Sequence, residues 1–119
     1  MNLQKIYPSL LTADLAAAEG WYTKLLGRGP DYRPMNTLLH WELFDQGGLM
    51  LSSSDEIAGR GAIFLYVDNI EAERHRLQGL GIVLGKDIEG DYSTLAQVRD
   101  PDGNLITLAT PPSRPFPPA

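Results

Sequence analysis

An internal repeat is the feature of this sequence that most constrains its fold. Residues 6–27 and 61–81 each begin with a short apolar run, continue in a helical pattern and end on a glycine. A residue suited to capping stands at the expected start of each helix, Asp14 in the first segment and Asn69 in the second. Such side chains accept hydrogen bonds from free helix amides, and the closing glycine relieves strain at the other end. The pattern indicates one strand–helix unit written twice.

Two β-prone stretches joined by a turn follow each helical segment. The turn lies at residues 45–48 in the first copy and at residues 100–104 ("DPDGN") in the second. The second turn is strongly specified because proline fixes φ and glycine accepts the left-handed region. Shorter stretches at residues 31–33 and 82–84 each predict one more strand. The predicted order is therefore β-α-β-β-β, followed by the same order again.

Composition limits the classes of protein that this chain can represent. It has 119 residues, with 43% hydrophobic and 21% charged side chains, which is typical of one globular domain. It has no cysteine, which excludes disulfides, thiolate nucleophiles and cysteine zinc sites. The net charge of −5, with no basic cluster, argues against nucleic acid and membranes as partners. No secretory signal is recognisable, so we expect a cytoplasmic location.

The domain organisation is predicted from the same repeat. We expect a single domain over residues 1–119, built from a first module, a linker, a second module and a proline-rich tail. These parts cover residues 3–54, 55–60, 61–109 and 110–119. The tail has five prolines in ten residues, so we expect it to be extended or disordered.

Three of these features together resemble the vicinal oxygen chelate superfamily, which includes glyoxalases, bleomycin-resistance proteins and extradiol dioxygenases. They are the repeated βαβββ unit, "WYTKLLG" at the end of the first helix, and "RDPDGNLITL" near the C-terminus. The resemblance covers residues 3–109. It implies an α+β fold in which two βαβββ modules form a curled mixed sheet around a central cavity. Because short members usually pair, it also implies a homodimer.

Metal-using members of this superfamily carry ligands at fixed places, and the resemblance maps each place onto a residue here. The matching positions are occupied by Tyr7, Met50, Ala62 and Thr107. A hard divalent ion needs several imidazole or carboxylate ligands, which these residues do not supply. Thr107 alone proves little, since threonine is common in strands, so the argument rests on all four positions. We therefore expect no metal and no other cofactor.

The two histidines were considered as an alternative metal site. His40 and Glu42 share one face of a strand and form a two-ligand fragment. We expect that face to be the convex one, under the helices or towards solvent. His75 lies on a charged helix face and is expected to be solvated.

Strand alternation predicts which side chains line the cavity. The predicted ligand-binding residues are Tyr7, Ser9, Trp41, Leu43, Met50, Ser52, Ala62, Phe64, Tyr66, Leu105 and Thr107. They form a mostly apolar wall with aromatic rings and a few hydroxyls, as is usual for organic ligands. Trp41, Phe64 and Tyr66 could stack on a planar ring or attract a cation, although the same rings could fill the core. Trp21 and Tyr22 are expected to pack the first helix on its sheet.

The leading hypothesis is a binding protein without metal that resembles the bleomycin-resistance branch. It would sequester a small aromatic or cationic molecule by burial and stacking. The alternative is an enzyme of the same superfamily, of lyase, isomerase or dioxygenase type. It would use a displaced metal site at His40 and Glu42, or acid–base chemistry from Tyr7, Glu42 or Asp45. A third hypothesis is a structural or regulatory module whose cavity is filled.

Overall fold

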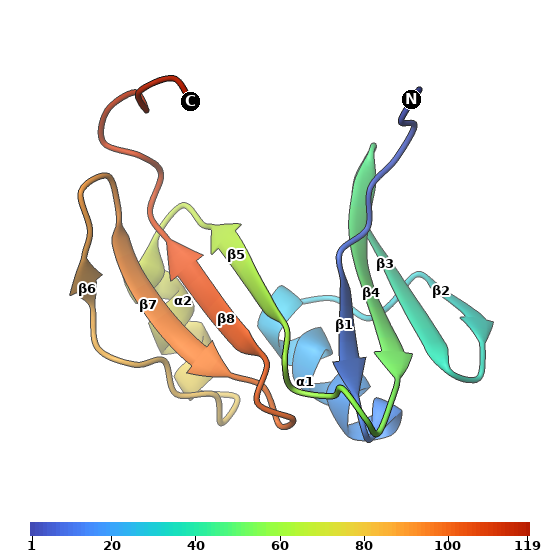
Figure 1. Ribbon diagram of the computed structural model, residues 1–119. Coiled ribbons are helices and arrows are strands. Elements are labelled where there is room, and N and C mark those ends of the chain that lie inside the picture. The colour runs from blue at the N-terminus through green and yellow to red at the C-terminus, as the bar shows by residue number, and fades with distance from the viewer. The chain divides into compact units, whose positions relative to one another are not determined.

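The computed structural model describes residues 1–119 and contains two helices and eight strands. The chain divides into two compact units, residues 1–62 with 99–105 and residues 63–98 with 106–119. Each contains the greater part of one four-stranded sheet and the helix that packs on it (Figure 1). The fold is α+β and repeats the order βαβββ, as the sequence predicts.

The first sheet has the order β1-β4-β3-β2. Its elements are β1 (Ser9–Thr12), α1 (Leu15–Leu26), β2 (Tyr32–Met35), β3 (Leu38–Phe44) and β4 (Gly47–Ser53). β1 runs parallel to β4, whereas β3 is antiparallel to both of its neighbours, so the sheet is mixed. One face of this sheet packs against α1 (Figure 1). We call the other face, which α1 does not cover, the open face.

The second sheet repeats this arrangement with the order β5-β8-β7-β6. Its elements are β5 (Ala62–Tyr66), α2 (Ile70–Gln78), β6 (Ile88–Glu89), β7 (Thr94–Arg99) and β8 (Leu105–Ala109). β5 and β8 point the same way, and β7 runs against β8 (Figure 1). Two copies of one strand–helix–hairpin unit therefore form two mixed sheets.

The residues predicted to cap the starts of both helices are confirmed, and so is the glycine that closes the first helix. Asp14 accepts a hydrogen bond from the third backbone amide after it at 3.1 Å, and Asn69 does the same at 3.0 Å. The first helix ends at Gly27, whose φ of 75° lies in the left-handed region. The second helix instead ends at Gln78 with Gly79 as its cap, and Gly81, with φ of 85°, lies in the turn that follows. These positions need glycine because a Cβ would be strained there.

The helix-covered face of the first sheet forms the core of the first unit. Its fully buried side chains include Leu39, Trp41 and Leu51 from the sheet and Tyr22 from α1. Trp21, the other member of the predicted aromatic pair, is half-buried, and its ring centroid lies 4.9 Å from that of Tyr22. The prediction that Tyr22 packs the helix on the sheet is confirmed.

The turn at residues 100–104 is held by one buried carboxylate. Oδ1 of Asp100 accepts the backbone N–H groups of Asp102, Gly103 and Asn104, each at 2.9 Å. Oδ2 accepts the Tyr22 hydroxyl at 2.6 Å and the Asn104 amide at 2.8 Å. Burial, followed by the bond to Asp100, raises the pKa of Tyr22 far above its ordinary value. The turn is thereby joined to α1.

The strand predicted at residues 82–84 is wrong. Ile82 and Leu84 are buried around an exposed Val83, so the segment alternates in burial as a strand would. Pairing with β7 instead forms at β6, where Ile88 and Glu89 lie opposite Leu95 and Thr94. Alternate burial produces the same alternation of apolar and polar residues whether or not the backbone pairs with a neighbouring strand.

The proline-rich tail forms neither helix nor strand, yet it contacts the loop before β7. The Ser113 amide donates to the Tyr92 carbonyl at 2.8 Å. The Tyr92 ring lies 4.7 Å from the Arg114 guanidinium and 4.8 Å from the Phe116 ring.

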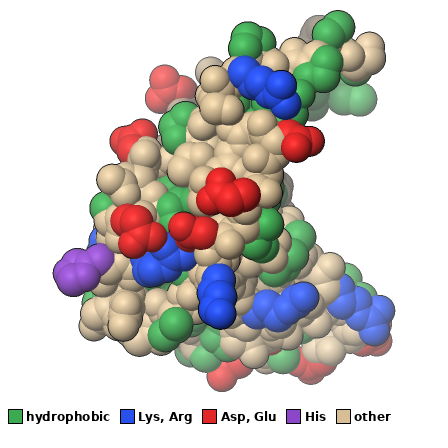
Figure 2. All heavy atoms as spheres, turned by 90° about the vertical axis from the view of Figure 1, so that its left-hand side faces the viewer, with side chains coloured by type: hydrophobic (Ala, Val, Ile, Leu, Met, Phe, Trp, Pro, Cys, Tyr) green, Lys and Arg blue, Asp and Glu red, His purple; other side chains and the backbone are tan.

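Acidic and basic side chains are mixed on the face of the molecule drawn in Figure 2. Neither of the two helices has the length and apolarity that crossing a membrane requires.

Candidate functional site

A β-bulge in the first hairpin decides which side chains of β3 lie on the open face. Phe44 pairs with Gly47, but Trp41 pairs with Leu49, so the register shifts by one residue between them. A Cβ at Gly48 would collide with the Trp41 carbonyl, so glycine is needed for this close approach. Because side chains alternate between faces, a shift of one residue exchanges the two faces of β3.

Trp41 lies in the core as a result, which corrects the predicted arrangement. We expected it to lie opposite Met50, on one face with Leu39 and Leu43. Instead it is fully buried on the helix-covered face, and its indole N–H donates to the Arg28 carbonyl at 2.9 Å. Leu43 lies within the bulge and is half-buried. Without the bulge, the register of the turn would have placed Trp41 opposite Met50.

His40 occupies the open face, which also corrects its predicted location. His40 pairs with Met50, and Met50 pairs with Ser9, so these three residues form one row across β3, β4 and β1. The next row contains Ser52, paired with Leu11 and Leu38. Ser9, Met50 and Ser52 were predicted to share the ligand-facing surface, and they share the open face.

Tyr7, His40 and Glu42 form a cluster on the open face, which we call the Tyr7–His40–Glu42 cluster. The Tyr7 hydroxyl donates to the two carboxylate oxygens of Glu42 at 2.8 and 2.7 Å. The Tyr7 and His40 rings meet edge to face, with centroids 4.3 Å apart. His40 Nε2 is buried without a hydrogen-bond partner, 3.3 Å from Glu42 Oε1. The hydrogen bond to Glu42 raises the pKa of Tyr7, which favours the protonated phenol.

A second carboxylate holds the backbone beneath this cluster. Asp31 Oδ2 accepts the backbone N–H of Glu42 at 2.7 Å, and Oδ1 accepts from Arg28 at 2.8 Å. The Glu42 amide, and then the Arg28 guanidinium, lower the pKa of Asp31 below its usual value. The Tyr32 ring lies 6.0 Å from that of His40. Asp31 therefore fixes the backbone of β3 at Glu42.

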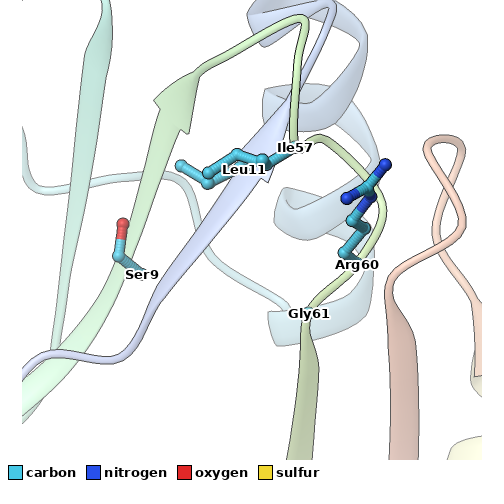
Figure 3. Close-up of a pocket in the computed structure, with 5 residues that line it drawn as sticks. All are labelled: Ser9, Leu11, Ile57, Arg60 and Gly61. Carbon is cyan, nitrogen blue, oxygen red and sulfur yellow. The ribbon is translucent and has the colours of Figure 1, made fainter.

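A pocket of about 310 Å³ opens at the β1 side of the first sheet. Its lining residues are Ser9, Leu11, Ile57, Arg60 and Gly61 (Figure 3). Two of them come from β1 and the others from the segment that leads into β5. The pocket contains an arginine and a hydroxyl beside two aliphatic side chains, and so combines apolar contact with a cation.

The predicted residues of the second sheet differ in exposure. Phe64 and Tyr66 are about half exposed, and their ring centroids lie 5.2 Å apart. Thr107 is buried, and its hydroxyl accepts a hydrogen bond from the Gln97 amide at 3.1 Å. Ala62 is exposed, and Leu105 is half-buried. Aromatic surface in this sheet is thus concentrated on β5.

The four positions that correspond to metal ligands do not fit a divalent ion. Tyr7 is engaged with Glu42, the Thr107 hydroxyl is engaged with Gln97, and Met50 and Ala62 offer no hard donor. His40 and Glu42 form a pair only, and the structure brings together no group of three or more histidine, aspartate or glutamate side chains suited to a metal. The donor set therefore does not match the one that the superfamily resemblance implies.

Comparison with solved structures identifies the fold. A glyoxalase/bleomycin resistance protein from Catenulispora acidiphila superimposes with a TM-score of 0.82 at 26% identity, covering 91% of this chain and 98% of that chain. The chain has the vicinal oxygen chelate fold. TnmS3, an antibiotic binding protein from a Streptomyces species, gives a TM-score of 0.75 at 22% identity, over 93% and 96% of the two chains.

A lactoylglutathione lyase from Agrobacterium tumefaciens has the same fold, with a TM-score of 0.74 at 20% identity over 88% and 91% of the chains. Binding proteins and an enzyme thus share the fold, which by itself does not decide between them. No model of a protein family matches the sequence. No curated protein matches it either.

Sequence reasoning missed four of the residues that now define the open face and its pocket. It assigned His40 and Glu42 to the opposite face, and it did not consider Ile57 or Arg60. The pair of glycines at 47 and 48 was interpreted as a turn alone, although glycine within a strand also marks a bulge. For Ile57 and Arg60 the sequence offered no signal beyond their place in an irregular segment.

Proposed function

We propose that this protein binds and sequesters a small planar aromatic molecule that carries a positive charge, without metal and without chemical change to the ligand. The observation that carries the proposal is the Tyr7–His40–Glu42 cluster, where a carboxylate lies beside two aromatic rings on the open face of the first sheet. Aromatic faces and a carboxylate both attract organic cations. The name of TnmS3, an antibiotic binding protein with the same fold, supports the same class of function.

The ligand would lie flat on the open face. Met50, next to His40 in the same row, offers a flexible apolar contact, and Ser9 offers a hydroxyl. The exposed rings of Phe64 and Tyr66, in the other unit, are a separate candidate surface for stacking. The predicted set that we retain is Tyr7, Ser9, Leu43, Met50, Ser52, Ala62, Phe64, Tyr66, Leu105 and Thr107, to which His40 and Glu42 are added.

Titration with proflavine, a planar aromatic cation, tests this function. Binding is measured by calorimetry and by the emission of the dye. Tryptophan fluorescence is not used, because Trp41 lies in the core and is a poor reporter. Glu42→Gln should weaken proflavine binding about tenfold through loss of the charge. Glu19→Gln is the matched control, since Glu19 lies on α1 at the other face and pairs with Arg33. Equal affinities of the two variants would contradict a role for Glu42.

One observation favours an enzyme as the second candidate. Tyr7 and Glu42 form a phenol–carboxylate pair at 2.7–2.8 Å, and such a pair can serve as acid and base. The raised pKa of Tyr7 would keep the phenol protonated as the acid. Mass spectrometry of proflavine and other bound aromatic compounds after incubation distinguishes the two candidates. Sequestration predicts that each compound is recovered with unchanged mass and chromatographic retention, whereas an enzyme would yield a product, an isomer of equal mass included, whose formation Tyr7→Phe abolishes.

Assembly, location and biological role complete the proposal. We expect a homodimer, which the half-exposed apolar rings of β5 support. Light scattering after gel filtration should give twice the monomer mass of 13.1 kDa, and a monomer mass would exclude it. We further propose that the protein acts in the cytoplasm and protects the cell from an antibiotic. Expression in a sensitive host should raise the inhibitory concentration, and Glu42→Gln should remove that protection.

A further inference from the structure

The pocket beside Ser9 contains a cation without a partner. Arg60 has neither a hydrogen bond nor an ion pair in the structure, and its side chain lines the pocket with Leu11 and Ile57 (Figure 3). Other arginines of the same unit are engaged: Arg28 binds Asp31, and Arg33 binds Glu19. A free guanidinium at an apolar pocket is suited to a carboxylate, which it binds through two parallel hydrogen bonds.

This pocket is in line with the Tyr7–His40–Glu42 cluster. Ser9 lines the pocket and belongs to the row in which Met50 and His40 follow on the next two strands. Two strand spacings separate Ser9 from His40, a span of about 10 Å across the sheet. The cluster has a carboxylate at one end of this row, and the pocket has a guanidinium at the other. A negative charge therefore lies near the His40 end of the row, and a positive charge near the Ser9 end.

We propose that the pocket is a carboxylate subsite, and that the ligand is an aromatic zwitterion with an ammonium group at one end and a carboxylate at the other. The inference rests on the proposed binding function and specifies its ligand class. The ammonium end lies at Glu42, the ring system crosses Met50, and the carboxylate enters the pocket at Arg60. The ring system would cross the row from His40 to Ser9, which spans about 10 Å.

The backbone beside Arg60 is held in place. A Cβ at Gly61 would come within 2.7 Å of a Leu10 methyl group and 3.1 Å of the Asn104 amide oxygen. Asn104 accepts the Gly61 N–H at 2.8 Å, which fixes the segment beside the pocket. Arg60 thus extends from a backbone that is held in place, while its own side chain remains unpaired.

Norfloxacin and its ethyl ester form a matched pair of probes. Both are planar aromatic molecules with a protonated piperazine, and only norfloxacin carries a free carboxylate. Affinities are measured by calorimetry in buffer with a chelator, because the acid also binds divalent ions. We expect the wild-type protein to bind the acid about tenfold more tightly than the ester.

Variants of two arginines make the test specific. Arg60→Gln should abolish the preference for the acid, and Arg60→Lys should retain part of it. Arg33→Gln removes the same charge from an arginine that points to α1, and it should retain the full preference. Equal binding of acid and ester by the wild type, or a preserved preference in Arg60→Gln, would overturn the carboxylate subsite.

Proflavine separates this inference from the function on which it rests. If proflavine binds and the acid gains nothing over the ester, the subsite is wrong and the binding function stands. If proflavine, norfloxacin and the ester all fail to bind at millimolar concentration, the proposed function is wrong and the subsite falls with it.

Discussion

The two hairpins of this protein have the same place in the repeat but are closed in different ways. The first, β3–β4, turns at Asp45 and Gln46, and Gly48 lets the backbone of β4 approach the Trp41 carbonyl at the bulge. The second, β7–β8, turns around the buried carboxylate of Asp100, which collects hydrogen bonds from the turn and from Tyr22. The first hairpin therefore requires glycine at a close backbone contact, whereas the second is stabilised by a network of buried hydrogen bonds.

The two hairpins differ in their roles: the first carries residues of the candidate site, and the turn of the second contributes to the stability of the fold. The bulge of the first hairpin turns His40 to the open face and Trp41 into the core. The hydrogen bonds of Asp100 join the second turn to α1 through the Tyr22 hydroxyl. They also orient the Asn104 side-chain amide, which donates to the Leu11 carbonyl at 3.1 Å. Substitutions in the two turns should consequently differ in size and in kind.

The largest effect is expected at Asp100. Asp100→Ala removes the carboxylate acceptor of the Asp102 and Asn104 backbone amides, the Tyr22 hydroxyl and the Asn104 side-chain amide, and leaves the Gly103 amide only the Asp100 carbonyl. We expect a loss of about 5 kcal/mol, comparable with the total stability of a small domain. Asp45→Ala, at the exposed first turn, should change stability by less than about 0.5 kcal/mol. Urea unfolding followed by circular dichroism measures both, and similar midpoints would refute the contrast.

Trp41 is expected to come next. Trp41→Ala removes a fully buried ring and should lower the unfolding free energy by about 4 kcal/mol. Phe64→Ala removes a half-exposed ring and should cost less than about 1 kcal/mol. Thermal and urea unfolding distinguish the two. A small loss for Trp41→Ala would show that the ring faces solvent and that the bulge does not hold.

The bulge itself can be tested at Gly48. A Cβ there would collide with the Trp41 carbonyl, so Gly48→Ala should cost about 2–3 kcal/mol. Gly20→Ala is the contrasting variant, because a Cβ at Gly20 meets nothing within 4 Å. Alanine in the middle of α1 should stabilise the chain by about 1 kcal/mol. Changes of the same sign in both variants would argue against the bulged register.

The smallest effect is expected from the titration of Tyr22 at alkaline pH. Its pKa is raised in the folded state, so above pH of about 10 the unfolded chain loses this proton while the folded chain keeps it. The unfolding free energy should fall by about 1 kcal/mol between pH 10 and 11 from this group. Tyr22→Phe should flatten that decline, although it lowers stability at neutral pH. An unchanged alkaline slope in the variant would contradict the assignment.

Much of the fold could be predicted from the sequence because its signals are local. Asp14 and Asn69 determine where the helices begin, and Gly27 determines where α1 ends, through backbone groups within a few residues. The DPDGN turn is specified in the same way. The strand expected at residues 82–84 failed because alternate burial reveals the environment of side chains and leaves the backbone partner undetermined.

The sequence by itself determined the repeat, the helix caps, the second turn and the lack of hard ligands at Tyr7, Met50, Ala62 and Thr107. Only the tertiary structure decided that Trp41 lies in the core and that Tyr7, His40 and Glu42 meet. It also decided that Arg60, whose guanidinium has no partner, lines a pocket. The physical reason is the period of a strand. One extra residue in a bulge leaves composition and propensity unchanged, yet it exchanges the two faces of the strand and thereby decides which side chains a ligand can reach.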